Sequence, residues 1–276
     1  DWSSDVCSSD LWSMNLFQRK RYKYFYDTHV HTSEASACAK NTGAEMARAA
    51  KAAGYTGIII TDHAWNGNTC IDPSLPWETW VEAFCKGYEN AKKEGKKIGL
   101  SVFFGYESNF DGTEFLVYGL DKEWLIRHPQ IKKATVEQQF KMVHDGGGIV
   151  IQAHPYREAD YIPRVRLYPT DSDLTEIFNG AHSSPLSTSH YNPDFDRQAV
   201  EYARKYGVEV TAGSDVHSVQ MLGAGIAVKE KWKTVVDYIM TVAQNGDFIM
   251  CSGEGWYDRK LNPYTQEKYL PKRRMV

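Results

Sequence analysis

Five short runs of apolar residues along the chain each end in polar, ionisable side chains. They cover residues 24–31, 57–63, 100–107, 148–154 and 208–217. Continuous runs rich in Val, Ile and Leu are typical of strands buried on both faces, as in a parallel sheet covered by helices. The carboxyl ends of such strands meet at one edge, where α/β barrels build their active sites. The pattern therefore predicts an α/β fold with His, Asp and Glu side chains gathered at that edge.

Helical patterns separate these predicted strands. Thr42 and Glu45 match a capping box that opens an Ala-rich helix ending at Gly54. Aromatic and apolar residues at helical spacing predict a second helix that begins near Trp77 and runs to Gly95. We further expect helices over 135–145, 195–206 and 233–245, a hairpin turn at 111–112, a strand over 247–251 and a loop over 155–173.

The first predicted strand ends in two histidines, His29 and His31. Residues i and i+2 of a strand project to the same face, so both imidazoles can converge on one ion. A half-buried strand with two hydrogen-bonded histidines would give the same short motif. The other four predicted strands also carry metal-ligand residue types at their ends, namely His63, Glu107, His154, Asp215 and His217. The set as a whole predicts a metal centre, because imidazole and carboxylate groups are common ligands of divalent ions.

The ordered set of motifs resembles the pattern of the PHP superfamily (polymerase and histidinol phosphatase). The residues that carry the resemblance are His29, His31, Thr61, Asp62, His63, Glu107, Ala153, His154, Pro155, Gly213, Ser214, Asp215 and His217. The resemblance implies a distorted (β/α)7 TIM-like barrel that holds two or three divalent ions and hydrolyses phosphate esters. The stretch 176–180 also resembles a strand of the family's phosphoesterase branch.

The resemblance also implies roles for individual residues. It implies a first ion with four ligands, which are His29, His31, Glu107 and Asp215. Glu107 would bridge to a second ion held by His154, while His63 and His217 would face a further ion or the substrate. Asp62, beside His63, is expected to orient a ligand imidazole from outside the ion's own shell.

The chain departs from the fullest family pattern in two places. Trinuclear members carry another histidine shortly after the first two, where this chain has Ser36, Ala37 and Cys38. They carry one more in or after the strand that follows the bridging glutamate, where this chain has residues 114–118. We therefore expect two well-held ions, of zinc, manganese or iron, and a third position that is empty or filled only when phosphate is bound. Cys38 is interpreted as a small buried thiol, and His182 is the best spare candidate for the missing ligand of the second ion.

These residues predict a cytoplasmic metal-dependent phosphatase or phosphodiesterase that attacks a small phosphorylated metabolite with a metal-activated water. The expected catalytic residues are Glu107, Asp215 and His217. Arg157 is expected either to bind a substrate phosphate or to form a surface salt bridge. Histidinol phosphatase and an exonuclease for short oligonucleotides stay open as alternatives. So does a degenerate PHP module that binds metal only for stability.

Composition agrees with one soluble globular domain. Hydrophobic residues make up 42% of the 276 residues and charged residues 24%, which is ordinary for such a domain. The net charge of −3 gives no general attraction to nucleic acid. Five cysteines without a Cys-x-x-Cys motif argue against a disulfide framework and a zinc ribbon. No run of eighteen apolar residues is present to span a membrane.

The first thirteen residues lack the basic region and the apolar core of a signal peptide. They resemble a translated sequencing-adapter artefact. We therefore expect residues 1–13 to be a non-native leader, Met14 to be the true start, and residues 14–276 to form a single domain.

Overall fold

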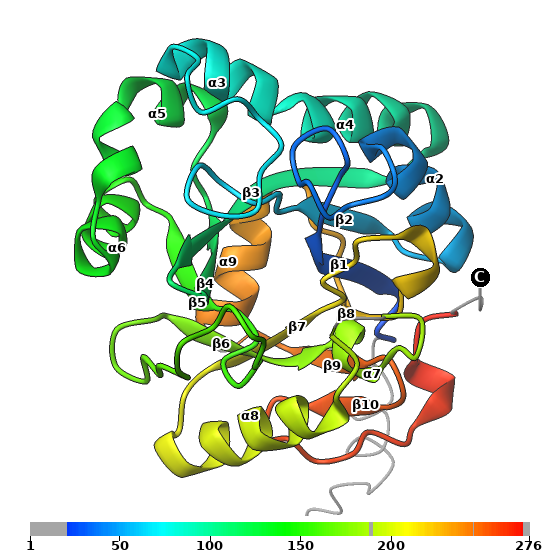
Figure 1. The fold of residues 1–276 in the computed structure, drawn as a ribbon. Coiled ribbons are helices and arrows are strands. Elements are labelled where there is room, and N and C mark those ends of the chain that lie inside the picture. The colour runs from blue at the N-terminus through cyan, green and yellow to red at the C-terminus, as the bar shows by residue number, and fades with distance from the viewer. Residues whose placement is uncertain (1–20, 188–189, 245, 273–276) are drawn as a thin grey trace, which may run out of the picture.

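The computed structural model describes residues 21–187, 190–244 and 246–272, and the expected leader at 1–13 lies outside them. The elements run in the order β1 (Tyr24–Val30), α2 (Gly43–Ala53), β2 (Gly57–Ile60), α3 (Trp77–Phe84), α4 (Lys86–Ile98), β3 (Ser101–Phe110), β4 (Thr113–Tyr118), α5 (Lys122–Arg127), η1 (Pro129–Lys133), α6 (Val136–Asp145), β5 (Ile149–Gln152), β6 (Leu174–Asn179), α7 (Gly180–Ser183), α8 (Pro193–Tyr206), β7 (Val210–Gly213), η2 (Val219–Met221), β8 (Ala224–Val228), α9 (Val235–Ala243), β9 (Phe248–Ser252), β10 (Trp256–Asp258) and η3 (Glu267–Tyr269) (Figure 1).

The strands form one curled ten-stranded sheet in the order β10-β9-β8-β1-β2-β3-β4-β5-β6-β7. Two groups of three strands, β1-β2-β3 and β5-β6-β7, are parallel within themselves. The sheet curls back on itself, because the segment after β7 meets the end of β1 in a bridge between Val216 and Val30. The amide of His31 donates to the carbonyl of Val216 at 3.1 Å. The carboxyl ends of β1 and β7 are thereby brought together.

The α/β class is confirmed, but the seven-fold (β/α) count is not. β4 runs antiparallel to both of its neighbours, β3 and β5. The β1–β8, β8–β9 and β9–β10 pairs are antiparallel as well. The hairpin turn expected at 111–112 explains the first departure, because it returns the chain directly alongside β3 instead of through a helix.

The predicted second helix is wrong as a single element, because it is two helices separated at Cys85. Its predicted end at Gly95 also lies inside α4, which ends at Ile98 and is capped by Gly99 in the left-handed conformation with φ 70°. Gly95 is a packing residue: a Cβ atom there would lie 2.7 Å from the carbonyl oxygen of Leu100. By contrast, the capping box of Thr42 and Glu45 is confirmed at the start of α2.

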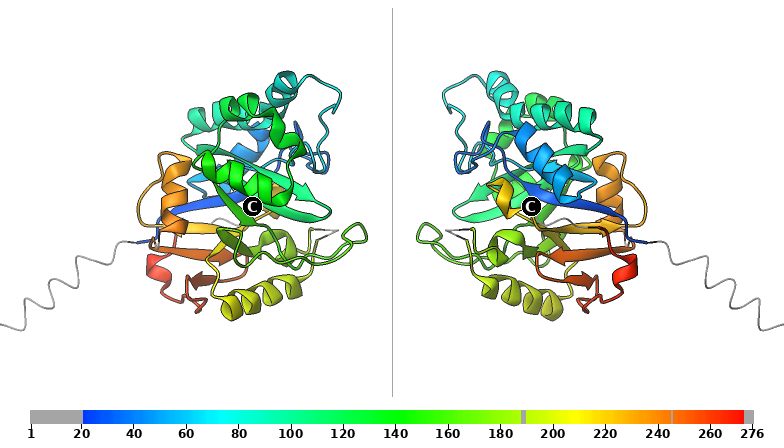
Figure 2. Two further views of the ribbon diagram at one scale, coloured as in Figure 1. Left: turned by 90° about the vertical axis from the view of Figure 1, so that its left-hand side faces the viewer. Right: turned by 90° about the vertical axis from the view of Figure 1, so that its right-hand side faces the viewer.

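The apolar faces of the sheet are covered on both sides, so its strands are buried almost throughout. All four residues of β2 and all six of β4 are buried. Helices α2, α4 and α6 lie along β2, β3 and β5, and α8 lies along β6 (Figure 1, Figure 2). No helix within the described residues is long and apolar enough to cross a membrane.

Candidate metal centre

The seven residues expected to be ligands converge at the carboxyl edge of the sheet, and all are buried. Six of them lie at the ends of β1, β2, β5 and β7 or shortly after those strands, and Glu107 lies within β3. The Nε2 atoms of His29 and His31 lie 3.0 Å apart, as two imidazoles directed at one point would. The strand-end pattern therefore places these groups together, although they are up to 188 positions apart in the chain (29 to 217).

Glu107 lies at the middle of this group and faces histidines with each of its carboxylate oxygens. Oε1 is 3.1 Å from Nε2 of His154 and 3.4 Å from Nε2 of His29. Oε2 is 2.8 Å from Nδ1 of His63 and 3.5 Å from Nε2 of His31. Burial opposes ionisation of this carboxyl, but His29 and His63 outweigh burial and hold its pKa well below the usual range. A carboxylate placed in this way can serve two neighbouring ions.

Asp215 provides a second anionic group close to the first histidine pair. Its Oδ1 is 3.2 Å from Nε2 of His31 and 3.4 Å from Nε2 of His29. Asn179 donates to its other oxygen at 3.2 Å. The backbones of Asp215 and His154 have φ of 52° and 24°, a conformation that costs side-chain-bearing residues about 1–3 kcal/mol and is typical of functional sites.

Hydrogen bonds behind the ligands orient the first histidine pair. Nδ1 of His29 is 3.0 Å from Oε1 of Glu176, and Nδ1 of His31 is 3.2 Å from Oγ of Ser36. Ser36 Oγ donates in turn to Oδ1 of Asp62 at 2.7 Å. Each imidazole thus directs its Nε2 toward the cluster. Asp62 therefore lies behind the imidazole of His31, with Ser36 between them. Ser36 and Glu176 were not assigned roles from the sequence.

Unpartnered buried atoms indicate that the cluster suits a cation. Nδ1 of His63 and Oε2 of Glu107 are both buried without a hydrogen-bond partner, although they face each other. Ligand atoms of five sets of three residues lie within 4.8 Å of one another. The sets are His29, His31 and Glu107; His29, His154 and Asp215; His63, Glu107 and Glu114; His31, His63 and His217; and His190, Asp215 and His217. A nitrogen and oxygen donor set of this kind fits zinc, manganese or iron.

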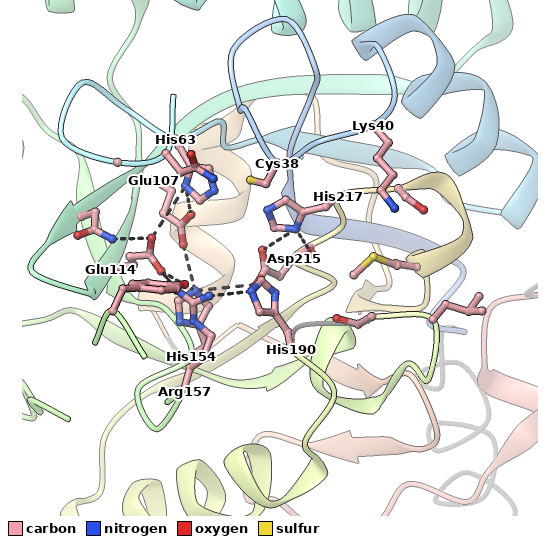
Figure 3. A pocket seen from close by; sticks show the side chains of 18 of the residues that line it. Cys38, Lys40, His63, Glu107, Glu114, His154, Arg157, His190, Asp215 and His217 are labelled. Atoms are coloured by element: carbon pink, nitrogen blue, oxygen red, sulfur yellow. Dashed lines mark hydrogen bonds and ion pairs between the residues drawn. The ribbon is translucent and has the colours of Figure 1, made fainter. Parts of the chain in front are cut away.

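A pocket of about 590 Å³ opens over this cluster (Figure 3). Arg157 lines this pocket and is buried. The expectation of a salt bridge at the surface is therefore wrong, because the ion pair of Arg157 is buried. Its Nη2 pairs with Glu114, and its Nη1 lies 2.9 Å from Nε2 of His190. Burial lowers the pKa of His190 to about 3, so this imidazole is neutral and accepts from the guanidinium.

Glu114 and His190 also lie at the site, although no role was expected for either from the sequence. Glu114 pairs with Asn109 across the β3–β4 hairpin, so the turn expected at 111–112 was the available signal. His190 follows α7 in a segment without a periodic pattern, and no sequence signal pointed to it. His182, the spare candidate, lies in none of the sets above: its Nδ1 bonds to Oδ1 of Asp196 at 2.6 Å.

Cys38 also lines the pocket and is only partly buried, which differs from the small buried thiol that we expected. Burial opposes ionisation of the thiol, but hydrogen bonds to His217 and His63 outweigh it and lower its pKa to about 6. The thiol is therefore part of the site.

The fold and the site define a mixed α/β protein with several buried histidines at one edge of its sheet. The PHP domain model matches residues 27–250, and the chain belongs to the PHP domain family. No match was found among the curated proteins.

Two solved structures share the fold at low sequence identity. One is a two-domain protein from Bacteroides vulgatus containing a predicted PHP-like metal-dependent phosphoesterase, with 12% identity and a TM-score of 0.55. The match covers 82% of this chain and 64% of that one, so this chain spans less than two thirds of its length. The other is PsfC from Pseudomonas syringae, with 18% identity, a TM-score of 0.53, and coverage of 80% and 89%.

Proposed function

We propose that this protein is a metal-dependent phosphatase or phosphodiesterase that acts on a small phosphorylated metabolite. The observation that carries the proposal is the position of Glu107 between two sets of histidines, at the base of a pocket that also contains a buried arginine. The PHP-like phosphoesterase contained in the Bacteroides protein supports the same class of reaction.

The ligand sets suggest which residues would hold each ion. A first ion would be held by His29, His31, Glu107 and Asp215, whose side chains contact one another. A second would be held by Glu107 and His154, and Glu114 is the nearest unassigned carboxylate, with Oε2 at 3.6 Å from Nε2 of His154. When bound, such ions polarise phosphoryl oxygens and activate water. His217, whose Nδ1 lies 3.0 Å from the carbonyl of Asp215, is held in one orientation beside them.

Arg157 is the proposed ligand of the substrate phosphate. Its contacts with Glu114 and His190 fix the plane of the guanidinium, while its buried Nε–H group has no partner in the structure. The positive charge of the guanidinium at the pocket wall would attract an incoming phosphate. A pocket of about 590 Å³ is the size that small metabolites occupy.

A screen of phosphorylated metabolites tests this proposal. Protein stripped of metal would be loaded with manganese, iron or zinc and assayed for phosphate release, with histidinol phosphate and short oligonucleotides among the substrates. We expect turnover that requires metal and is lost when Glu107 is replaced by Gln. Full metal binding without turnover on any substrate would instead support the degenerate structural module.

A further inference from the structure

We propose that Cys38 completes a third ion position at the pocket mouth, with its sulfur and the imidazoles of His63 and His217 as ligands. This inference rests on the proposed metal centre but concerns a different donor set. The family pattern leaves the third position of this chain short of a ligand, and Cys38 lines the pocket beside the two histidines of that position. Such a position would be occupied without any phosphate in the pocket.

The three groups converge from three separate segments of the chain. The side chains of Cys38, His63 and His217 line the same pocket. In Figure 3 the sulfur lies between the two rings. The centroids of those rings are 5.8 Å apart, and each ring lies within 4.4 Å of the ring of His31. Ligand atoms of the three histidines lie within 4.8 Å of one another. The thiol thus faces a preformed group of imidazoles rather than a single neighbour.

The loop that carries Cys38 is held in place on both sides of the residue. The amide of Ala37 donates to the carbonyl of Asn68 at 2.9 Å, and the amide of Lys40 donates to the carbonyl of His217 at 2.8 Å. These bonds attach the loop to the two segments that follow β2 and β7, which also supply the histidines. A sulfur presented by such an ordered loop loses little conformational entropy when an ion binds.

The donor set determines which ion suits this position. Two imidazoles and one thiolate form a three-ligand site that leaves the fourth tetrahedral position open, as zinc accepts in catalytic sites. Thiolate is a poor ligand for magnesium or manganese, so this position favours zinc or cobalt over them. Nδ1 of His63 lies 2.8 Å from Oε2 of Glu107. The open coordination position would therefore adjoin the bridging carboxylate and the pocket.

Cobalt titration of the metal-free full chain tests the proposal by absorption, independently of turnover. We expect a near-ultraviolet thiolate-to-cobalt band in the natural protein. The Cys38→Ser variant should lack this band and should bind one equivalent of metal less. Cys38→His should keep the metal count but lose the band. Cys70→Ser is the matched control, because that exposed thiol contacts only the carbonyls of Ser33 and Glu34 among its described hydrogen bonds. It should retain the band.

Two results would overturn the proposal: no thiolate band in the natural protein at cobalt saturation, or an unchanged band and metal count in a folded Cys38→Ser variant. Circular dichroism of each variant separates misfolding from loss of a ligand. A Cys38-dependent band without turnover would support the sulfur site and count against the phosphoesterase activity. Metal-dependent turnover without the band would support the phosphoesterase activity and contradict the sulfur site.

Discussion

Nδ1 of His29 lies 3.0 Å from Oε1 of Glu176, and neither side chain is exposed to solvent. This contact fixes the tautomer of His29, because Nδ1 carries the proton and Nε2 is left as the ligand atom. The negative charge of Glu176 also makes that nitrogen a better donor to a cation. Glu176 therefore tunes the centre without contacting the ion itself.

Replacing Glu176 with Gln should weaken metal affinity by about 10–100-fold, as expected when a charged partner behind a ligand histidine is neutralised. The amide can still accept from His29 but no longer supplies charge. Competition with a chromophoric chelator measures the change. Glu123→Gln, at an exposed position in the first turn of α5, is the control. Equal affinities for the two variants would show that Glu176 does not act through His29.

Replacing Glu107 with Gln should lower kcat by more than about 100-fold. The loss should exceed that for a residue such as Glu176, because Glu107 is proposed to bind the ions directly and Glu176 only hydrogen-bonds to a ligand. The amide has no charge and cannot bridge two cations. The fold should survive, since all four short contacts of Glu107 run to histidines of the same site. Steady-state kinetics alongside circular dichroism would check both statements. Near-normal kcat in the folded variant would mean that the bridging assignment is wrong.

Replacing Arg157 with Lys should raise KM by about tenfold or more, because an ammonium group cannot reproduce the planar contacts of the guanidinium. Arg157→Lys would also leave Glu114 and His190 without their shared partner. The control is Arg197→Lys on α8, where the arginine is exposed and bonds to Asp194. A KM that changes equally in both variants would remove Arg157 from the substrate site.

Replacing Gly87 with Ala should lower the free energy of unfolding by about 1–3 kcal/mol through overpacking. A Cβ atom there would lie 1.8 Å from Oγ1 of Thr32 and 3.0 Å from Oδ2 of Asp62. Thr32 would have to move away from Asp62, to which its hydroxyl donates at 2.6 Å. Urea denaturation measures the loss, and Lys93→Ala on the exposed face of α4 is the control. An unchanged midpoint for Gly87→Ala would contradict this packing.

The sequence could predict the ligand cluster because strand periodicity and the shared edge of parallel strands follow from local patterns. His29, His31 and Asp215 lie at such positions, and they meet in the structure. The position of Glu114 at the site depends on the register of an antiparallel hairpin, and the position of His190 depends on an irregular segment. Neither position could be predicted from periodicity. The split at Cys85 likewise interrupts an otherwise continuous helical pattern.

The most direct test of the account is anomalous diffraction from crystals of protein purified without chelator, recorded above the zinc, iron and manganese edges. We expect one peak among His29, His31 and Asp215, and a second beside His154, separated by the carboxylate of Glu107. The proposed sulfur site adds a third peak beside Cys38. Crystals of metal-loaded protein with these side chains in place but no anomalous peak among them would contradict the central claim.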